Sequence, residues 1–320
     1  METVWKKVIW AVDPFEGPGA ARDRVVTALR DIESRTSVEI EPVYVLSPSE
    51  LNLSVDLDLA WIEQYRPAAE TALRQLASQM GLHRIAEPSV LGHGSSSIRD
   101  AVQHLASHAE AVGADLIVAG THGRRGVPRL LMGSFAETLV LHSRVPTLIV
   151  GRACQRSLDH VIFATDLGEH SRVLFDRAVA LAEQLGAKLS VFHSLPNPVE
   201  PVFQSGMFLL GGAWVPVHHY FSEDAEHRRA QVAEWVAYAR SLGVDAHEAI
   251  DESGESVVEA LLGYAEREKG GLIALAAESG PVMTALVGSI PRQVVRHSSC
   301  PVWILHPEQE RAQRAGRSAA

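Results

Sequence analysis

The sequence contains little of what marks secreted, disulfide-stabilised or membrane-spanning proteins. Its 320 residues include two cysteines, Cys154 and Cys300, and neither lies in a CxxC motif or a metal-ligand spacing. A disulfide framework and a thiolate zinc site are therefore not expected. The most apolar loop-like stretch, residues 207–217, has 11 residues and is too short to cross a bilayer. Because residues 1–12 also lack the apolar run of a signal peptide, we expect a cytoplasmic protein without a membrane span.

Positive charge is also scarce. Lys and Arg number 29 against 39 Asp and Glu, so the formal net charge is −10. A chain this acidic is a poor general binder of nucleic acid or anionic membranes, and a polyanion could bind only at a locally basic site. Hydrophobic residues make up 46% and charged residues 21%, which is typical of a globular protein, and the length suits two domains.

Common catalytic and metal-binding motifs are absent from the sequence. The chain has no HExxH, no GxSxG and no Walker A lysine, which argues against a zinc protease, a serine hydrolase of that type and a P-loop motor. His218, His219 and His227 lie close together, but adjacent histidines on a strand point apart. We therefore predict no metal site, and the motifs identify no catalytic residue.

An internal repeat organises the chain. The matched pairs are VIWAVD (8–13) with VIFATD (161–166), Gly133-Ser134 with Gly288-Ser289, and HSRVP (142–146) with HSSCP (297–301). Repetition at a nearly constant offset indicates two copies of one domain. We predict a first copy over residues 1–152, a second copy over 158–306 and a flexible tail over 307–320.

Each copy alternates short apolar strands with helices. In the first copy the pattern predicts strands over 7–12, 38–46, 84–91, 115–119 and 146–150, and helices over 18–34, 57–80, 95–112 and 134–143. In the second copy it predicts strands over 160–165, 187–193, 244–250, 271–276 and 301–305, and helices over 170–185, 223–242, 255–268 and 289–298. Strands that are apolar on both alternations suit a parallel sheet buried on both faces. The expected fold is α/β, with two tandem doubly wound domains and helices on both faces of each sheet.

One loop of the first copy has the features of a phosphate site. A strand ends at Gly120, a loop rich in glycine and arginine follows, and a helix begins near Ser134, where Glu137 completes the spacing of a capping box. Backbone N–H groups at a helix start are unpaired and carry positive partial charge, and glycines let the backbone approach a ligand closely. The loop also carries Arg124, Arg125 and Arg129. Judged on these residues alone, solvated arginines in an ordinary turn explain the loop equally well.

The wider pattern resembles the universal stress protein family. The spacing Gly120-x2-Gly123-x9-Gly133-Ser134 is similar to the ATP-binding signature of that family, and the aspartate-terminated first strand and the final His-Ser-x-x-Pro with its apolar strand agree. The resemblance implies a Rossmann-like sheet of five parallel strands in the order 3-2-1-4-5. It also implies domains that pair through their last strands, so 146–150 and 301–305 would pair within one chain as a fused dimer.

The resemblance also implies residue roles. Gly120 and Gly123 would pass close to the ribose and phosphates, Gly133 and Ser134 would donate to the phosphates, Asp13 would sit on the adenosine side and Val45 beside the adenine. The full set of expected ATP-binding residues is Asp13, Val45, Gly120, His122, Gly123, Arg124, Gly133, Ser134 and Phe135. An aspartate after a strand can instead simply cap the next turn, and a capping serine needs no ligand. The residues after Asp13 also depart from the usual small polar pattern.

The second copy carries a degenerate version of the same loop. Ala276 and Ser279 stand where Gly120 and Gly123 stand, and no Lys or Arg occurs between Gly270 and Pro291. Glu278 also adds a negative charge where His122 lies in the first copy. A Cβ at the point of close approach and an anion near the phosphates both oppose nucleotide binding. We therefore expect one ATP per chain, held by the first copy. The second copy also has an apolar insert over 195–222, for which folding against its own domain is slightly favoured over an exposed interface or lid.

Three classes of function remain open at this stage. The favoured one is an ATP-binding stress-response or regulatory protein, in which the nucleotide changes domain or partner association. The alternatives are a slow ATP hydrolase, for which His122 is the one nearby candidate base, and a nucleotide-free interaction scaffold. The implied cofactor is ATP, with Mg²⁺ left open, and AMP or another adenine nucleotide remains an alternative. The expected partners are an adenine nucleotide and an unidentified protein, and binding of nucleic acid is not expected. The two copies would form a pseudo-dimer within one chain, and association of two chains into a homodimer is left undecided.

Overall fold

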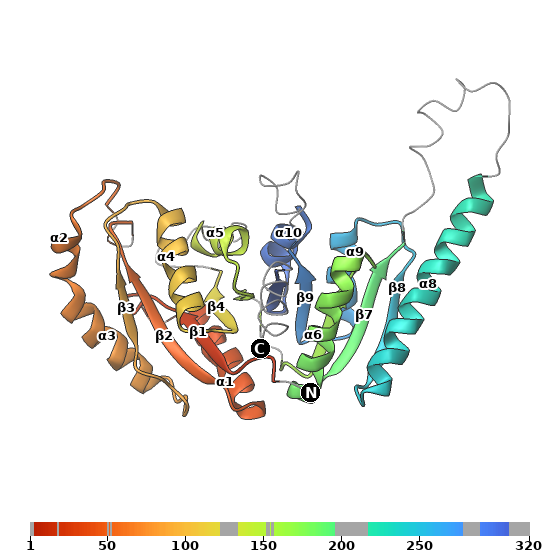
Figure 1. Ribbon diagram of the computed structural model, residues 1–320, viewed down its shortest axis with the longest axis horizontal. Coiled ribbons are helices and arrows are strands. Elements are labelled where there is room, and N and C mark those ends of the chain that lie inside the picture. Colours follow the sequence, from red (N-terminus) through yellow and green to blue (C-terminus); the bar gives the residue numbers. More distant parts are fainter. Residues whose placement is uncertain are drawn as a thin grey trace, which may run out of the picture.

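The computed structural model shows two α/β halves joined side by side (Figure 1). It describes residues 3–17, 19–49, 51, 53–121, 134–151, 154, 157–195, 217–277 and 289–306, with side chains in the last two ranges described from 224 and 290 onward. Both halves have strands in the middle and helices on either face (Figure 1). This confirms the expected α/β fold class.

In the first half, strands and helices alternate as the hydrophobic pattern predicts. The elements are β1 (Lys7–Ala11), α1 (Ala20–Arg35), β2 (Glu39–Leu46), α2 (Leu59–Glu63), α3 (Arg66–Gln79), β3 (Ser89–Gly92), α4 (Ile98–Ala111), β4 (Leu116–Gly120), α5 (Ser134–His142) and β5 (Thr147–Val150). The middle of β1 and all but the last residue of β4 are buried, because helices cover both faces of the sheet.

The second half repeats this order with one longer helix. Its elements are β6 (His160–Ala164), α6 (Glu169–Leu185), β7 (Lys188–Ser194), α8 (Val217–Ser241), β8 (Ala246–Asp251), α9 (Val257–Arg267), β9 (Leu272–Ala276), α10 (Ser289–His297) and β10 (Val302–Leu305). Helix α6 ends at Gly186, whose φ of 61° confirms the expected left-handed cap. Helix α8 begins at Val217, so it takes up the end of the predicted insert, and residues 196–216 lie outside the described part of the chain.

The described strands form one continuous sheet in the order β3-β2-β1-β4-β5-β10-β9-β6-β7-β8. The first half has the expected order 3-2-1-4-5, and the second half repeats it in reverse. All neighbouring strands within each half are parallel, whereas β5 and β10 are antiparallel, with Val302 opposite Ile149 and Ile304 opposite Thr147. This confirms the pairing of the last strands within one chain.

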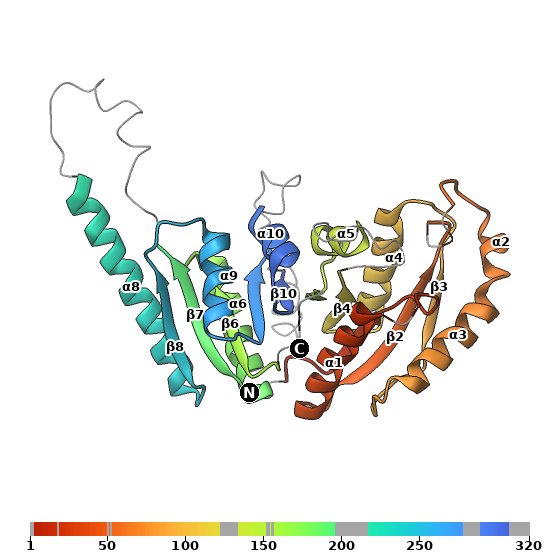
Figure 2. The ribbon, with the colours of Figure 1, turned by 180° about the vertical axis from the view of Figure 1, so that it is seen from behind.

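The contact between β5 and β10 has the geometry of a two-fold axis. Leu148 and Trp303 occupy the same place in their strands, and they face each other across the ladder. On either side of this pair, the remaining partners exchange places, as an isologous interface requires. The view from behind shows helices α5 and α10 at the centre of the molecule, where β5 and β10 meet in the sheet (Figure 2).

Buried aromatic and polar contacts hold the two halves together. Trp5 packs edge-to-face against Trp303, with ring centroids 5.4 Å apart, and both side chains are fully buried. The side chain of Gln184 on α6 accepts hydrogen bonds from the backbone N–H groups of Val4 and Trp5 and donates one to the Trp5 carbonyl. The N-terminal segment of the first half is thus bound to the second half, and one apolar core cluster includes residues of both.

Two expected elements differ in the structure. The helix predicted over 57–80 is two helices, α2 and α3, because Pro67 in the first turn of α3 cannot donate the bond that would continue α2. The strand predicted over 84–91 begins only at Ser89. Residue Ile85 forms an isolated bridge with Ile40, and Pro88 then interrupts the ladder before β3 starts.

Candidate functional site

The candidate site lies where β1 and β4 end. These two strands are adjacent and parallel, with Val8 opposite Leu116, so their carboxyl ends meet at one edge of the sheet. Asp13 follows two residues after the last residue of β1, and Gly120 is the last residue of β4. The structure therefore brings the regions of Asp13 and Gly120 together, as the sequence predicts.

Asp13 has a structural task in this position. Its Oδ1 accepts a hydrogen bond of 2.9 Å from the backbone N–H of Phe15, which forms the tight turn after β1. The turn-forming role is thus present in the structure, and a contact with adenosine remains a prediction for this residue.

Val45 lies near the end of β2, and its side chain is buried. It belongs to the apolar cluster formed with Ala101, Val102 and Leu105 on α4. Its neighbours in the strand, Tyr44 and Leu46, point to the other face and belong to the cluster under α2 and α3. Val45 therefore supports the α4 side of the sheet edge, and its expected contact with adenine is not tested by this packing.

The start of α5 brings backbone donors to the same edge. Helix α5 begins at Ser134, which is exposed, and continues with the partly buried Phe135. His122, Gly123, Arg124 and Gly133 lie within 122–133, outside the described residues, so the loop between Gly120 and Ser134 remains a prediction from the sequence.

The contacts described at the start of α5 differ from those of the expected capping box. Helix α5 starts at Ser134 itself, and an oxygen of Glu137 forms an ion pair with Nη2 of Arg292 from α10. The Ser134 carbonyl accepts a bond from the Thr138 hydroxyl one turn later. The neighbouring half thus provides the ionic partner of Glu137 that the local sequence pattern could not predict. Figures 1 and 2 both show α5 and α10 side by side at the junction.

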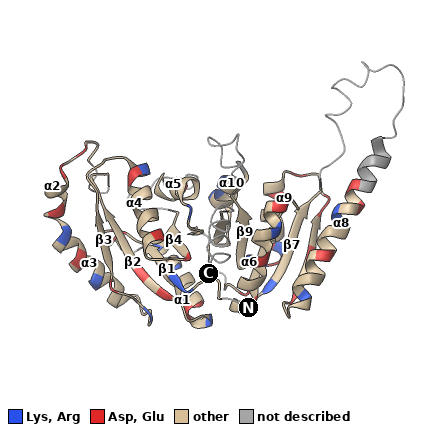
Figure 3. Ribbon diagram, viewed as in Figure 1, with Lys and Arg blue, Asp and Glu red and all other residues tan. Residues whose placement is uncertain are grey.

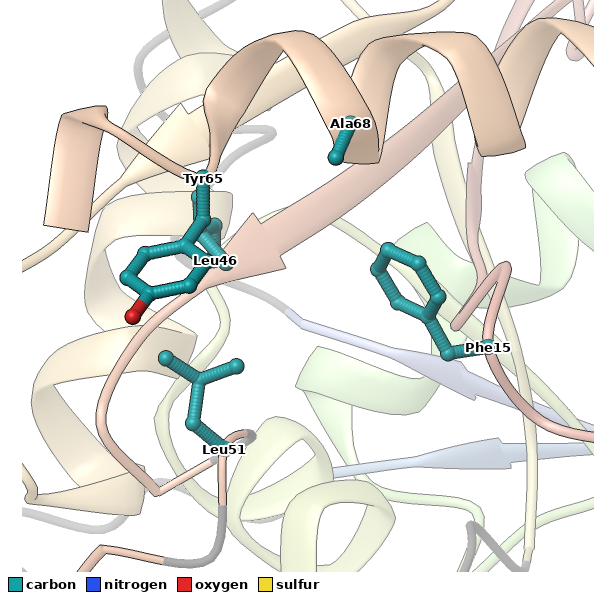
Figure 4. Close-up of a pocket in the computed structure, with 5 residues that line it drawn as sticks. All are labelled: Phe15, Leu46, Leu51, Tyr65 and Ala68. Atoms are coloured by element: carbon teal, nitrogen blue, oxygen red, sulfur yellow. The ribbon is translucent and has the colours of Figure 1, made fainter.

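A small pocket next to Asp13 was not predicted. Its lining residues are Phe15, Leu46, Leu51, Tyr65 and Ala68, and its volume is about 310 Å³. The rings of Phe15 and Tyr65 stand on opposite sides of the hollow, with Ala68 of α3 above it (Figure 4). The departure from small polar residues after Asp13 was the available signal, because it places the exposed ring of Phe15 at this edge of the sheet.

The equivalent edge of the second half differs at two matching positions. Gly120 is opposite Val150 in its ladder and Ala276 is opposite Leu305, so Ala276 places a Cβ where the first half has none. The strand registers likewise match Ser194 with Val45, and the Ser194 hydroxyl donates to the carboxylate of Asp251 at 3.0 Å. The second half is therefore more polar at this position than the first.

Asp166, the counterpart of Asp13, serves as an internal cap. Burial by itself raises the pKa of Asp166, but hydrogen bonds from the Ser171 hydroxyl and the Gly168 N–H to its Oδ1 outweigh this and lower it. The carboxylate therefore stays charged and holds the start of α6. The bond from Gly168 matches the bond that Phe15 donates to Asp13, and the bond from Ser171 is additional.

Charges on the surface are mixed. Figure 3 shows basic and acidic residues interspersed along α3 and α8, and ion pairs such as Arg74 with Glu70 and Arg228 with Asp224 connect them. Within the described ranges, no group of three or more His, Cys, Asp or Glu side chains could hold a metal ion. The same ranges contain no helix with the length and apolarity needed to cross a membrane.

Comparison with known proteins agrees with the repeated architecture. A sequence model of the universal stress protein family matches the chain twice, over residues 5–151 and 157–306. A Staphylococcus aureus (strain USA300) protein named for this family is 27% identical over 144 residues, which cover 44% of this chain and 75% of that protein.

Solved structures share the whole fold at low sequence identity. A universal stress protein from Archaeoglobus fulgidus DSM 4304 superposes with a TM-score of 0.64 at 19% identity, over 95% of this chain and 97% of that one. A functionally unknown protein from Pseudomonas aeruginosa PAO1 gives a TM-score of 0.58 at 13% identity, over 95% and 94% of the two chains. With two matches of the family model that together span most of its length, this chain belongs to the universal stress protein family.

Proposed function

We propose that this protein is a regulatory adenine-nucleotide-binding protein that holds one ATP, and that the first copy holds it. The observation that carries the proposal is the convergence of Gly120 and the start of α5 at one edge of the sheet, linked by the glycine spacing of the sequence. An N-terminus of this kind stabilises phosphate through unpaired N–H groups, and the three arginines of the loop add positive charge.

Each expected residue has a place in this proposal. Gly120, Gly123, Gly133 and Ser134 approach the ribose and phosphates, His122 and Arg124 lie beside the phosphates, and Phe135 follows them into the helix. Asp13 marks the adenosine side, and Val45 lies beside the adenine. The pocket between Phe15 and Tyr65 is apolar and lies next to Asp13, so it offers a wall for the flat, uncharged part of the ligand.

In this proposal, the second copy does not bind a nucleotide. Ala276 replaces a glycine at the strand end, and the loop sequence after it carries Glu278 and no arginine. Asp166 accepts a hydrogen bond from Ser171 in addition to the turn bond that it has in common with Asp13, and Ser194 donates a hydrogen bond to Asp251. We propose that this copy serves the structure and the response of the molecule, and that nucleotide binding alters the association of the halves or of a protein partner.

The proposal is tested by denaturing the purified protein and identifying the released nucleotide by mass spectrometry. We expect an adenine nucleotide, and titration calorimetry of the stripped protein should then give ATP binding. Protein that releases no nucleotide and gives no heat with ATP, with or without Mg²⁺, would instead be a nucleotide-free scaffold.

Gly123→Val tests the loop directly. If the backbone at this position contacts phosphate, the added side chain should weaken ATP binding by about 1–3 kcal/mol, comparable to leaving a buried polar group unpaired. The matched control is Ser279→Val, which makes the same residue at the equivalent position of the second copy and should leave ATP binding unchanged. Steady-state phosphate release that is lost in His122→Ala would favour the hydrolase alternative.

A further inference from the structure

The ion pair between Glu137 and Arg292 joins the two halves at equivalent positions. Each residue is the fourth of a nine-residue helix, α5 or α10, and the two residues are 155 positions apart in the chain. The guanidinium Nη2 donates to Glu137 Oε1, and the side chains are 39% and 23% exposed. At one and the same position, the first copy therefore carries an acid and the second copy a base.

Glu137 lies in a place where a negative charge has two opposite effects. A carboxylate in the first turn stabilises a helix, because it faces the positive end of the helix dipole. The same carboxylate, one turn from Ser134, repels an anion that approaches the N-terminus. An acidic residue at this position therefore weakens a phosphate site unless a positive group compensates for it.

Arg292 supplies that positive group from the other half of the molecule. Helix α10 begins after the degenerate loop, so the copy with no glycine signature contributes a cation next to the copy that has one. Two identical first copies around this axis would bring two Glu137 carboxylates together instead. The ion pair thus depends on the second copy having diverged at this position.

We propose that Arg292 is a specificity-determining residue of the first copy's nucleotide site, supplied by the second copy. By neutralising Glu137, it allows the start of α5 to accept a multiply charged phosphate chain and favours nucleotides with more phosphates. This inference rests on the proposed nucleotide site of the first copy. It gives the degenerate copy a role in ligand selection in addition to its structural one.

The test compares the affinities of ATP, ADP, AMP and adenosine by titration calorimetry in the full chain at low salt. Arg292→Gln leaves Glu137 uncompensated and should weaken ATP binding roughly five- to tenfold, with smaller losses for ADP and AMP and none for adenosine. Glu137→Gln should bind ATP at least as tightly as the original protein. The double variant Glu137→Gln/Arg292→Gln should recover most of the lost affinity, and the Arg292→Gln effect should shrink at high salt.

Arg296→Gln is the matched control, because it removes the same charge from an exposed position in the last turn of the same helix. It should leave all four affinities unchanged. If Arg292→Gln does not fold, as judged by circular dichroism, Glu137→Gln and Arg292→Lys carry the test, and Arg292→Lys should bind ATP nearly as the original does.

The outcomes separate this inference from the proposed function. If the original protein binds ATP and Arg292→Gln binds it equally well, or loses ATP and adenosine to the same extent, the role of Arg292 is overturned and the nucleotide site stands. A loss of ATP affinity in Glu137→Gln, or equal losses in Arg292→Gln and Arg296→Gln, would also overturn it. If the original protein binds no nucleotide, the proposed function and this inference both fail.

Discussion

At the scale of single residues, Trp303 is a large buried side chain at the centre of the junction. It is fully buried in β10, faces Leu148 across the pseudo-two-fold axis and packs against Trp5. Trp303→Ala should lower the free energy of unfolding by about 3–5 kcal/mol, because it removes a large buried ring and leaves a cavity. Urea denaturation measures this loss. Trp61→Ala, at a partly exposed position on α2, should cost far less, and equal costs would contradict the assigned importance of Trp303.

His306 should make the fold sensitive to acid. Burial lowers the pKa of His306 from 6.5 to about 4, so the residue is neutral in the folded state near pH 5 and charged in the unfolded state. The unfolded chain then binds more protons, and stability falls as the pH drops from about 6.5 towards 4. Between pH 7 and pH 5, the free energy of unfolding should fall by about 2 kcal/mol less in His306→Leu than in the original protein. Denaturation curves at both pH values measure this, and identical losses would exclude His306 as a cause.

At the scale of elements, the close approach of two loops explains why position 94 is occupied by glycine. A Cβ at Gly94 would lie 2.5 Å from the Leu57 carbonyl oxygen, and the Leu57 N–H donates to the Gly94 carbonyl at 2.8 Å. Gly94→Ala should therefore displace the segment before α2 and destabilise the protein by about 1–3 kcal/mol. Gly17→Ala is the control, because nothing lies within 4 Å of its Cβ position. Thermal unfolding of both variants tests this, and similar melting temperatures would contradict the steric account.

The elements also show how far the sequence predicts the structure. Buried strands, alternating helices and the cap at Gly186 follow from local patterns, and the structure confirms them. The break between α2 and α3 was missed because the apolar pattern continues across it, although Pro67 was a usable signal. Likewise, the resemblance to the family implies the pairing of β5 with β10, but no local pattern shows that Glu137 meets Arg292.

The candidate site, too, has features that the sequence predicts and features that it does not. The positions of Gly120 and Ser134 follow from the strand and helix that they end and begin. The pocket between Phe15 and Tyr65 depends on how α3 lies over the loop after β1, and tertiary packing alone decides that. Residues 122–133 remain predicted from the sequence, since the described chain stops at Thr121 and resumes at Ser134.

At the scale of the whole molecule, one sheet combines two copies of the same fold whose candidate sites have different residues. The copies are related by a pseudo-two-fold axis, yet they differ where a ligand would bind: glycine against alanine at the strand end, and acid against base at the helix start. A symmetric dimer of such domains would present two equivalent sites. In our proposal, the fused chain instead allows one copy to bind the nucleotide and the other to adjust the binding.

The number of nucleotides per chain tests this account most directly. Titration of the stripped full-length protein with ATP, followed by native mass spectrometry of the complex, gives that number. The account predicts one ATP per chain, bound about 1–3 kcal/mol more weakly in Gly123→Val and with unchanged affinity in Ser279→Val. Two nucleotides per chain, or one nucleotide whose affinity falls in Ser279→Val and not in Gly123→Val, would contradict it.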